Sequence, residues 1–326
     1  MVILGIETSC DETGIGLIKN NCVISNLIAS QDNIHFAYGG VVPELASRAH
    51  LESIDTLFLK ALEETCLTPE EIDVVGVTNH PGLKGCLLMG VSFACGLATA
   101  LNIPLYMVNH IYAHVAANFL NSQVCFPAIG FVISGGHTTF FYMGNPIDFN
   151  IIGQTVDDAC GETFDKVGRM LGLDFPGGPH VEQEALRGNE NRIKFPVVLL
   201  SKDSFDFSFS GLKTSVLYYI RKHGIKSNLP DICAGFQKAV GDVLIEKTKR
   251  VLKQYQPVSL LIGGGVIQNK YLQDRFRQLA FEYNVRLFIP DRKLCMDNGA
   301  MVAVMTSLFM EKGILPSDKK ITVIPT

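Results

Sequence analysis

Two histidines four residues apart, His110 and His114, have the spacing of a metal-binding pair. On a helix this spacing places both imidazoles on one face, with Cβ atoms about 5–6 Å apart, near enough to bind one ion. Asp297, expected to open the equivalent helix of a second half of the chain, supplies a third ligand. Two imidazoles and one carboxylate leave positions open for a substrate, and zinc and iron(II) both accept such a set. The pattern predicts a catalytic metal site, with a packed or solvated histidine pair as the alternative.

A zinc protease is one function class that a histidine pair suggests. The HExxH motif of those enzymes needs a glutamate directly after the first histidine as general base, and Ile111 stands there. A protease is therefore disfavoured.

Two glycine-rich loops have the composition of an anion or nucleoside site. Ser134–Thr138 falls between two expected strands, where glycine backbones can approach a phosphate and successive N–H groups form an anion-binding nest. A plain hairpin is the alternative. Gly263–Gly265, followed by Asn269, offers a flat surface for a base or ribose and an amide to hydrogen-bond it. Neither loop fits a P-loop or the GxGxxG pattern.

Three further segments have chemical groups and a structural alternative. Four carboxylates of Asp157–Lys166 surround a helix start, which the helix dipole favours by itself, but Asp165 lies further in and could face ribose hydroxyls or a metal-bound ligand. Pro176–Pro179, followed by Glu182, is either the floor of a nucleoside pocket or a simple helix boundary. In Phe205–Thr214, Ser210 is expected to cap a helix and the three phenylalanines to pack in the core.

The elements that must position these residues follow one order twice, βββαβαβα. Strands are expected over residues 2–8, 14–19, 22–30, 72–78, 104–108, 127–134, 138–143, 147–152, 258–262 and 285–289. Helices are expected over residues 51–62, 85–101, 162–171 and 269–283, and from about residues 110 and 297.

The expected domains are 1–122, then 123–296 with a helical insertion at about 180–255, and a C-terminal helix and tail, 297–326, returning to the first lobe. If the repeat is real, equivalent loops face a cleft at the carboxyl ends of the strands. A single irregular α/β fold is the alternative.

Composition narrows the function classes. The 326 residues carry 28 Lys+Arg against 32 Asp+Glu, a formal charge of −4, and 47% are hydrophobic, which excludes disorder and a global attraction to nucleic acid. RNA contact would have to come from local basic clusters or from a partner; the clusters are Arg221, Lys222 and Lys226, and Lys247, Lys249, Arg250 and Lys253.

The cysteine pattern and the apolar stretches indicate the cellular compartment of the protein. The nine cysteines are scattered without a CxxC pair, as in reduced proteins of a cytosol-like compartment. The chain opens on a strand-like run without a basic leader, and its longest apolar stretch, 85–101, is short for a membrane span. A cytoplasmic protein without membrane contact is expected.

Several ordered motifs together resemble the TsaD (Gcp) family, which makes threonylcarbamoyladenosine in tRNA. They are Ile6–Thr13, Tyr38–Glu44 with Ala46–Arg48 and His50, His110–His114, Ser134–Thr138, Asp157–Lys166, Phe205–Thr214 and Asp297–Ala300. The resemblance runs from residue 3 to about 303, and the FSFSGLKT string is more similar to the bacterial and organellar branch than to the archaeal one. Tyr112, His80 and Lys84 depart from the family pattern without removing a ligand.

The resemblance implies an α/β fold of the duplicated ASKHA type (actin-like ATPase, RNase H-like), with ligand and metal in the cleft between two lobes. One divalent metal, iron(II) favoured over zinc, would be held by His110, His114 and Asp297. The adenylate would be bound by Val132, Ile133, Ser134, Gly135, Gly136, Asp165, Gly178, Glu182 and Asn269.

The reaction that the resemblance implies is transfer of threonylcarbamoyl from threonylcarbamoyl-AMP to the N6 amine of the adenosine next to the anticodon, in tRNAs reading codons that begin with A. That aromatic amine is a poor nucleophile, so a carboxylate should accept its proton, and Asp11 is the candidate. Expected partners are tRNA and TsaB-like and TsaE-like proteins, with TsaC-type enzymes supplying the adenylate. The alternatives are another nucleotide-binding protein of this fold, such as a sugar kinase or a non-catalytic partner, and a metallopeptidase. The histidine pair disfavours the sugar kinase and the non-catalytic partner.

Overall fold

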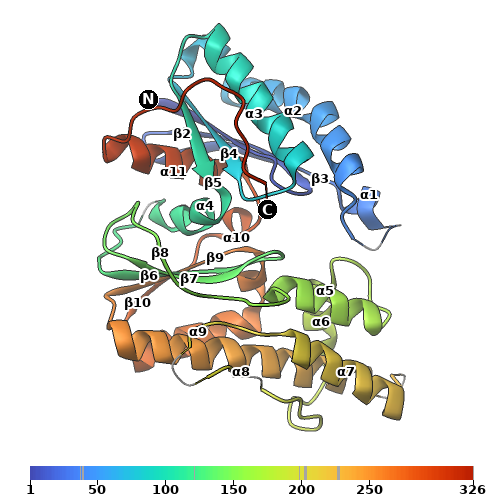
Figure 1. Ribbon diagram of the computed structural model, residues 1–326. Helices are drawn as coiled ribbons and strands as arrows, with labels where there is room; N and C mark the ends of the chain where they lie inside the picture. Colours follow the sequence, from blue (N-terminus) through green and yellow to red (C-terminus); the bar gives the residue numbers. More distant parts are fainter. Residues whose placement is uncertain are drawn as a thin grey trace. The chain divides into compact units, whose positions relative to one another are not determined.

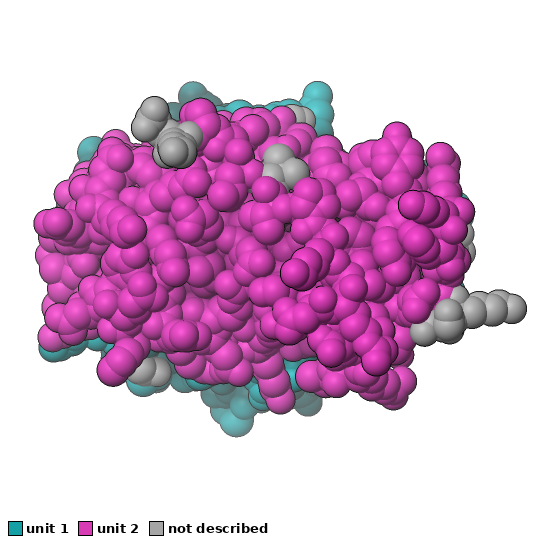
Figure 2. Space-filling view, turned by 90° about the horizontal axis from the view of Figure 1, so that it is seen from below, with its two compact units in different colours: residues 1–124, 290–326 teal, residues 125–289 magenta. Residues whose placement is uncertain are grey.

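The computed structural model describes residues 1–36, 38, 40–120, 122–197, 199–201, 204–225 and 228–325. Gly39 of the Tyr38–Glu44 motif and Lys226 of the first basic cluster lie outside these residues. The chain forms two compact units: unit 1 comprises residues 1–124 and 290–326, and unit 2 comprises residues 125–289 (Figure 2).

Unit 1 is built on a five-stranded mixed sheet in the order β3-β2-β1-β4-β5 (Figure 1). Its strands are β1 (Val2–Glu7), β2 (Glu12–Lys19), β3 (Cys22–Ser30), β4 (Val74–His80) and β5 (Leu105–Asn109). β1 pairs antiparallel with β2 and parallel with β4, which pairs parallel with β5. Every residue of β1 is buried, because helices cover both faces of the sheet.

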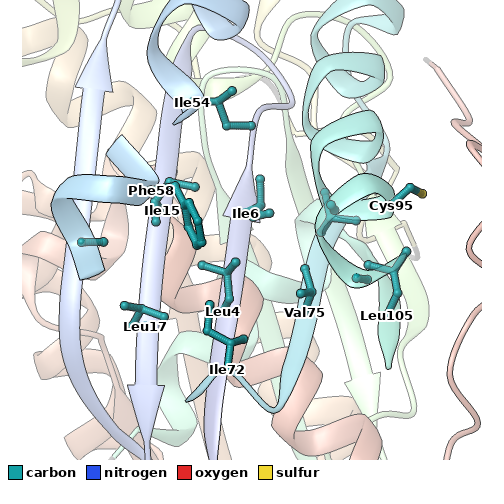
Figure 3. Packing of buried hydrophobic residues seen from close by; sticks show 14 of the residues in the cluster. Leu4, Ile6, Ile15, Leu17, Ile54, Phe58, Ile72, Val75, Cys95 and Leu105 are labelled. Carbon is teal, nitrogen blue, oxygen red and sulfur yellow. The ribbon is translucent and has the colours of Figure 1, made fainter. Parts of the chain in front are cut away.

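Helices α2 and α3 cover one face of this sheet. The helices of unit 1 are α1 (Asp32–Phe36), α2 (Pro43–Thr65), α3 (Lys84–Ala100), α4 (His110–Ala116), α10 (Arg292–Cys295) and α11 (Gly299–Glu311), with short 3-10 turns η1 (Pro69–Glu71) and η2 (Ala117–Phe119). Leu4, Ile6 and Ile15 of the sheet form one buried cluster with Ile54 and Phe58 of α2 (Figure 3). Burying each such side chain contributes about 1.5–3 kcal/mol, so this cluster holds the strand ends in register with the helices.

Helix α11 covers the other face through glycines. A Cβ at Gly299 would lie 2.1 Å from the Gly16 nitrogen and 2.5 Å from the Gly5 oxygen, so only glycine allows this approach of helix and sheet. The prediction that Asp297 opens a helix of the second half is wrong. The helix begins at Gly299, Asn298 caps it by accepting a hydrogen bond from the Met301 N–H, and its packing on β1 and β2 places Asp297 in unit 1.

Unit 2 repeats the sheet of unit 1, with the order β10-β9-β6-β7-β8. Its strands are β6 (Ala128–Ile133), β7 (Thr138–Met143), β8 (Asn150–Gln154), β9 (Ser259–Gly263) and β10 (Arg286–Phe288). β6 pairs antiparallel with β7 and parallel with β9, as β1 does with β2 and β4. The predicted duplication of the α/β fold is confirmed. The strand expected at 147–152 starts later, because Asn145 and Asp148 form a turn.

The helices of unit 2 are α5 (Cys160–Met170), α6 (Gly177–Ala185), α7 (Ser210–His223), α8 (Leu229–Tyr255) and α9 (Lys270–Glu282), with the 3-10 turn η3 (Gly265–Gln268). Phe207 and Phe209 are fully buried, as predicted, and Phe207 lies parallel to the Phe131 ring with centroids 5.6 Å apart, whereas Phe205 is half-buried. The prediction that Ser210 caps α7 is wrong. The Asp157 carboxylate accepts from the N–H groups of Phe209 and Ser210, so a distant residue caps the helix.

The second basic cluster contains a buried lysine. The Lys247 side chain is fully buried and its Nζ donates to the Ser204 carbonyl 2.6 Å away, so the interpretation of Lys247 as an RNA contact is wrong. Arg250 donates to Glu246 and Lys249 lies 3.8 Å from Glu282. Over the described part of the chain, no helix is both long and apolar enough to cross a bilayer.

Candidate metal centre and adenylate site

His110 and His114 lie on α4, the short helix that directly follows β5. Asn109 caps this helix by accepting hydrogen bonds from the N–H groups of Ile111 and Tyr112, which fixes where the helix starts. One helical turn then brings the two imidazole centroids to 4.7 Å from each other. Both rings are buried, at 6% and 1% residue exposure, so they are held by packing.

Asp297 completes the group. Its Oδ1 lies 3.1 Å from His114 Nε2 and 3.7 Å from His110 Nε2, and one ligand atom from each of the three residues lies within 4.8 Å of the others. The Asn298 side chain donates to the carbonyls of Leu294 and Met296, which pins the backbone on both sides of Asp297. The structure therefore brings together the three residues predicted to hold a metal.

His114 shows that these residues fit a cation. Both of its ring nitrogens are buried and neither forms a hydrogen bond of acceptable geometry with a described residue, although Asp297 Oδ1 lies 3.1 Å from Nε2. A buried polar group without a partner costs about 1–3 kcal/mol. A divalent cation held by His110, His114 and Asp297 would use one of these lone pairs, and three protein ligands leave room for a substrate oxygen.

Glu7 contacts His110 at Nδ1, the ring nitrogen that does not face Asp297. The carboxylate is fully buried at the end of β1, and its Oε2 lies 3.0 Å from His110 Nδ1. Burial raises the pKa of Glu7, but the charge of His110 and its hydrogen bond lower it more, so the pKa lies below its ordinary value. Burial lowers the pKa of His110, and the Asp297 and Glu7 charges raise it to about 9.

Asp11 lies in the loop between β1 and β2 of the same unit. Its carbonyl accepts from the Gln31 N–H, and the preceding Cys10 carbonyl accepts a hydrogen bond from His50 Nε2. Burial raises the pKa of the Asp11 carboxyl, and the Asp297 charge raises it further, while hydrogen bonds from Cys10 and Glu12 act in the opposite direction. A carboxyl with a raised pKa is a stronger base than an ordinary aspartate.

The Ser134–Thr138 segment is a tight hairpin between β6 and β7 of unit 2. The Ser134 N–H donates to the His137 carbonyl, and the His137 N–H donates to Ser134 Oγ. Gly135 and Gly136 at the tip are exposed, and neither N–H donates to another described residue. The hairpin alternative is therefore correct for the fold, and the exposed tip amides still match an anion-binding loop.

Two glycines of unit 2 contact the strand end and the hairpin. Gly161 of α5 donates to the Ser134 carbonyl, and Gly264 approaches Ile133 so closely that a Cβ would lie 2.4 Å from its oxygen. Val132 and Ile133 have fully buried side chains, so only their backbone can contact a ligand.

Contacts between helices connect the remaining predicted residues. Asp165 of α5 accepts from the Gly177 N–H, next to Gly178, at the start of α6. Glu182 of α6 accepts from the Lys270 N–H at the start of α9. Asn269 caps α9 by accepting from the Leu272 N–H and donates to the Gln237 side chain. Asp165, Glu182 and Asn269 thus each accept a hydrogen bond from an N–H in the first turn of a helix, a structural bond that the sequence did not indicate.

Asp158, two residues before α5, bridges α5 and α7. Its carboxylate accepts from Lys166 Nζ of α5 at 2.7 Å and from Lys213 Nζ of α7 at 2.5 Å, with 13% of its side chain exposed. Burial raises the pKa of Asp158, but the two ammonium groups lower it more. The bridge therefore stabilises the folded state while Asp158 is ionised.

We expect Asp158→Asn to lower the free energy of unfolding at pH 7 by about 1–3 kcal/mol, because it removes one partner of a largely buried bridge. Since the folded pKa lies below the unfolded value of about 3.9, the contribution is complete above that value and is lost as the pH falls through the folded pKa. Urea unfolding followed by circular dichroism at pH 7 and pH 3 measures the difference. The control, Asp274→Asn, breaks an exposed pair with Arg277 and should cost under about 0.5 kcal/mol at both. An equal loss for Asp158→Asn at both pH values would contradict the expectation.

The sequence motif Ile6–Thr13 contains Glu7, but the motif by itself indicates no role for this residue. A signal was present: Glu7 and His110 both stand where a strand ends, and the carboxyl ends of parallel strands such as β1 and β5 meet at one sheet edge. The bridging role of Asp158 had no such signal, because Lys213 is 55 residues away.

Comparison with known proteins gives consistent matches. A family model described as "TsaD: tRNA N6-adenosine threonylcarbamoyltransferase" matches residues 22–304. Three curated proteins carry the name tRNA N6-adenosine threonylcarbamoyltransferase. The one from Thermosipho africanus is 42% identical, covering 100% of this chain and 99% of that protein. Those from Syntrophomonas wolfei and Bacillus cereus are 46% and 45% identical, covering 93% and 96% of this chain and 90% and 92% of theirs.

Solved structures share the fold at low identity. Full-length HypF in a phosphate- and nucleotide-bound form superposes with a TM-score of 0.64 at 14% identity, covering 96% of this chain and 56% of that chain. Component A of the Acidaminococcus fermentans (R)-2-hydroxyglutaryl-CoA dehydratase superposes with a TM-score of 0.58 at 15% identity, covering 94% and 97%. These likenesses, with the duplicated sheets, show the predicted ASKHA fold.

Proposed function

The chain belongs to the TsaD family of tRNA N6-adenosine threonylcarbamoyltransferases, and we propose that it transfers threonylcarbamoyl from threonylcarbamoyl-AMP to the N6 amine of the adenosine next to the anticodon. In this reaction the N6–carbon bond forms, the bond from that carbon to the phosphate oxygen breaks, and AMP leaves. The family match over residues 22–304 carries the proposal, and the His110, His114 and Asp297 group supports it.

The residues of unit 1 would hold the metal and accept the proton. A divalent cation bound by His110, His114 and Asp297 would supply Lewis-acid stabilisation of the donor's phosphate and of the AMP leaving group. Iron(II) is favoured over zinc, because two histidines and one carboxylate with open positions are typical of non-haem iron sites. Asp11 would accept the proton that the N6 amine loses, since an aromatic amine attacks poorly without a base.

The residues of unit 2 would bind the adenylate. The exposed amides of Gly135 and Gly136 are suited to the phosphate, and backbone donors favour an anion without a charged side chain. Asp165, Glu182 and Asn269 carry oxygens or an amide suited to ribose hydroxyls and to the base.

The direct test combines metal analysis with a nucleoside assay. Protein purified without oxygen is analysed for metal and then incubated with threonylcarbamoyl-AMP, tRNA and TsaB-like and TsaE-like proteins, and the digested tRNA is examined by mass spectrometry. Formation of threonylcarbamoyladenosine supports the proposal. Cleavage of a protein substrate that stops with EDTA, without modified tRNA, would instead favour the metallopeptidase alternative.

We expect Gly135→Val to weaken binding of AMP or the adenylate at least about tenfold, or ~1.4 kcal/mol, because a branched side chain would occupy the phosphate approach. The fold should survive, since a Cβ at Gly135 meets no atom within 4 Å. Calorimetric titration measures the affinity. The matched control is Gly144→Val, since Gly144 follows the opposite end of β7 and is also exposed. Unchanged affinity in Gly135→Val would mean that the hairpin does not bind the phosphate.

We expect the purified chain alone to modify tRNA poorly and to need TsaB-like and TsaE-like partners. The net charge is −4, and Lys247 of the second basic cluster is buried, so few phosphate contacts are available. Each neutralised phosphate adds about 0.7–0.9 to the salt slope, so a handful gives weak, salt-sensitive binding. Turnover is compared with and without partners at physiological salt, with tRNA affinity measured beside it. Tight tRNA binding and many turnovers by the chain alone would refute the requirement.

A further inference from the structure

Both oxygens of the Glu7 carboxylate have hydrogen-bond partners. Its Oε1 accepts from the Ser9 N–H at 2.6 Å, and its Oε2 accepts from Thr78 Oγ1 at 2.6 Å and lies 3.0 Å from His110 Nδ1. Both carboxylate oxygens therefore act as acceptors, and the side chain is fully buried. A group with these bonds cannot turn without breaking several of them at once.

His110 is held between two carboxylates on opposite edges of its ring. Nδ1 lies 3.0 Å from Glu7 Oε2 and 3.2 Å from the Ser9 hydroxyl, while Nε2 lies 3.7 Å from Asp297 Oδ1, on the side of the three-ligand group. A proton on Nδ1 donated to Glu7 leaves the Nε2 lone pair for a cation. A proton on Nε2 would block it.

We propose that Glu7 is a positioning residue that holds the proton of His110 on Nδ1, so that Nε2 is presented as a metal ligand; this rests on the proposed metal centre. Carboxylates bound to the far nitrogen of a ligating histidine fix its tautomer and raise its basicity, and their loss costs about 10–100-fold in metal affinity. His114 has no such partner among the described residues, so Glu7 acts on one ligand of the pair.

Glu7→Gln isolates this role, because it changes one atom without changing size. The Ser9 N–H cannot become an acceptor, so the amide oxygen must take the place of Oε1 and the NH2 group must face His110. Nδ1 then accepts, and the ring proton moves to Nε2. The substitution is expected to reverse the tautomer while the Thr78 hydroxyl rotates to accept from the amide.

The experiment uses the full chain with 15N-labelled histidine. NMR spectra of the metal-free protein, at a pH where the ring is neutral, report which nitrogen of His110 carries the proton, and the His110→Ala spectrum assigns the signals. Competition with a chelator then gives the zinc affinity. We expect a hydrogen-bonded Nδ1–H in the wild-type protein, an Nε2–H in Glu7→Gln, and an affinity about 10–100-fold lower in that variant.

Thr78→Val is the control, because it removes one hydrogen bond to Glu7 and keeps the carboxylate. It should retain the Nδ1–H. An Nε2–H in the wild-type protein would overturn the proposal even if Glu7→Gln did not fold. So would a Glu7→Gln protein that keeps the Nδ1–H and binds zinc like the wild type. A wild-type protein that binds no metal would instead refute the metal centre itself.

Discussion

Protein with both His110 and His114 replaced by alanine should purify with less than about a tenth of the wild-type metal content and lose at least about 100-fold in tRNA modification. Asp297 is then the remaining ligand of the group, and a single carboxylate does not retain a transition metal through purification. Asp297→Ala, which keeps both imidazoles, should weaken metal binding by about 10–100-fold. Elemental analysis of matched preparations and the nucleoside assay measure the two effects.

The matched control for this pair is His180→Ala with His223→Ala, which removes two histidines of unit 2 that are not part of the group. Circular dichroism should show that both double variants are folded, since the imidazoles of the group are replaced by smaller apolar side chains rather than by charges. Full metal content in the His110 and His114 variant would show that the ion binds elsewhere.

Asp11→Asn should lower the rate of threonylcarbamoyl transfer by about 100- to 10,000-fold, the range that a general base contributes. The carboxamide keeps the size of the side chain but cannot accept the proton from the N6 amine. Single-turnover modification of tRNA from preformed threonylcarbamoyl-AMP, followed by mass spectrometry, measures the chemical step directly.

Metal content should stay within about threefold of the wild type in Asp11→Asn, because Asp11 is not one of the three residues that could hold the ion. The control Asp32→Asn removes a nearby carboxylate in the first turn of α1 and should leave the rate within about threefold. If Asp11→Asn transfers at the wild-type rate, another group must accept the proton.

Much of the architecture could be predicted from local patterns. The continuous apolar run of β1 and the alternation around it indicate buried strands, and the repeated order βββαβαβα already contained the duplication that the two sheets confirm. The proximity of His110 and His114 was also predictable, because a four-residue spacing on a helix places them on one face whatever the rest of the chain does. These features depend on neighbours in the sequence.

Other features depend on contacts between distant segments, and the sequence did not reveal them. The close approach of α11 to the sheet depends on glycines 5, 16 and 299. Glu7 meets His110 across 103 residues, and Asp157 caps a helix 52 residues later.

Lys247 also depends on a contact with a distant residue. Its place in a basic cluster on a helix suggests a solvated face, but its side chain is buried and donates to the Ser204 carbonyl. Residue types and short spacings therefore determined which side chains could do the chemistry. The tertiary structure decided which of them are neighbours, because each of these contacts needs two surfaces to pack, and that packing depends on the whole unit rather than on one segment.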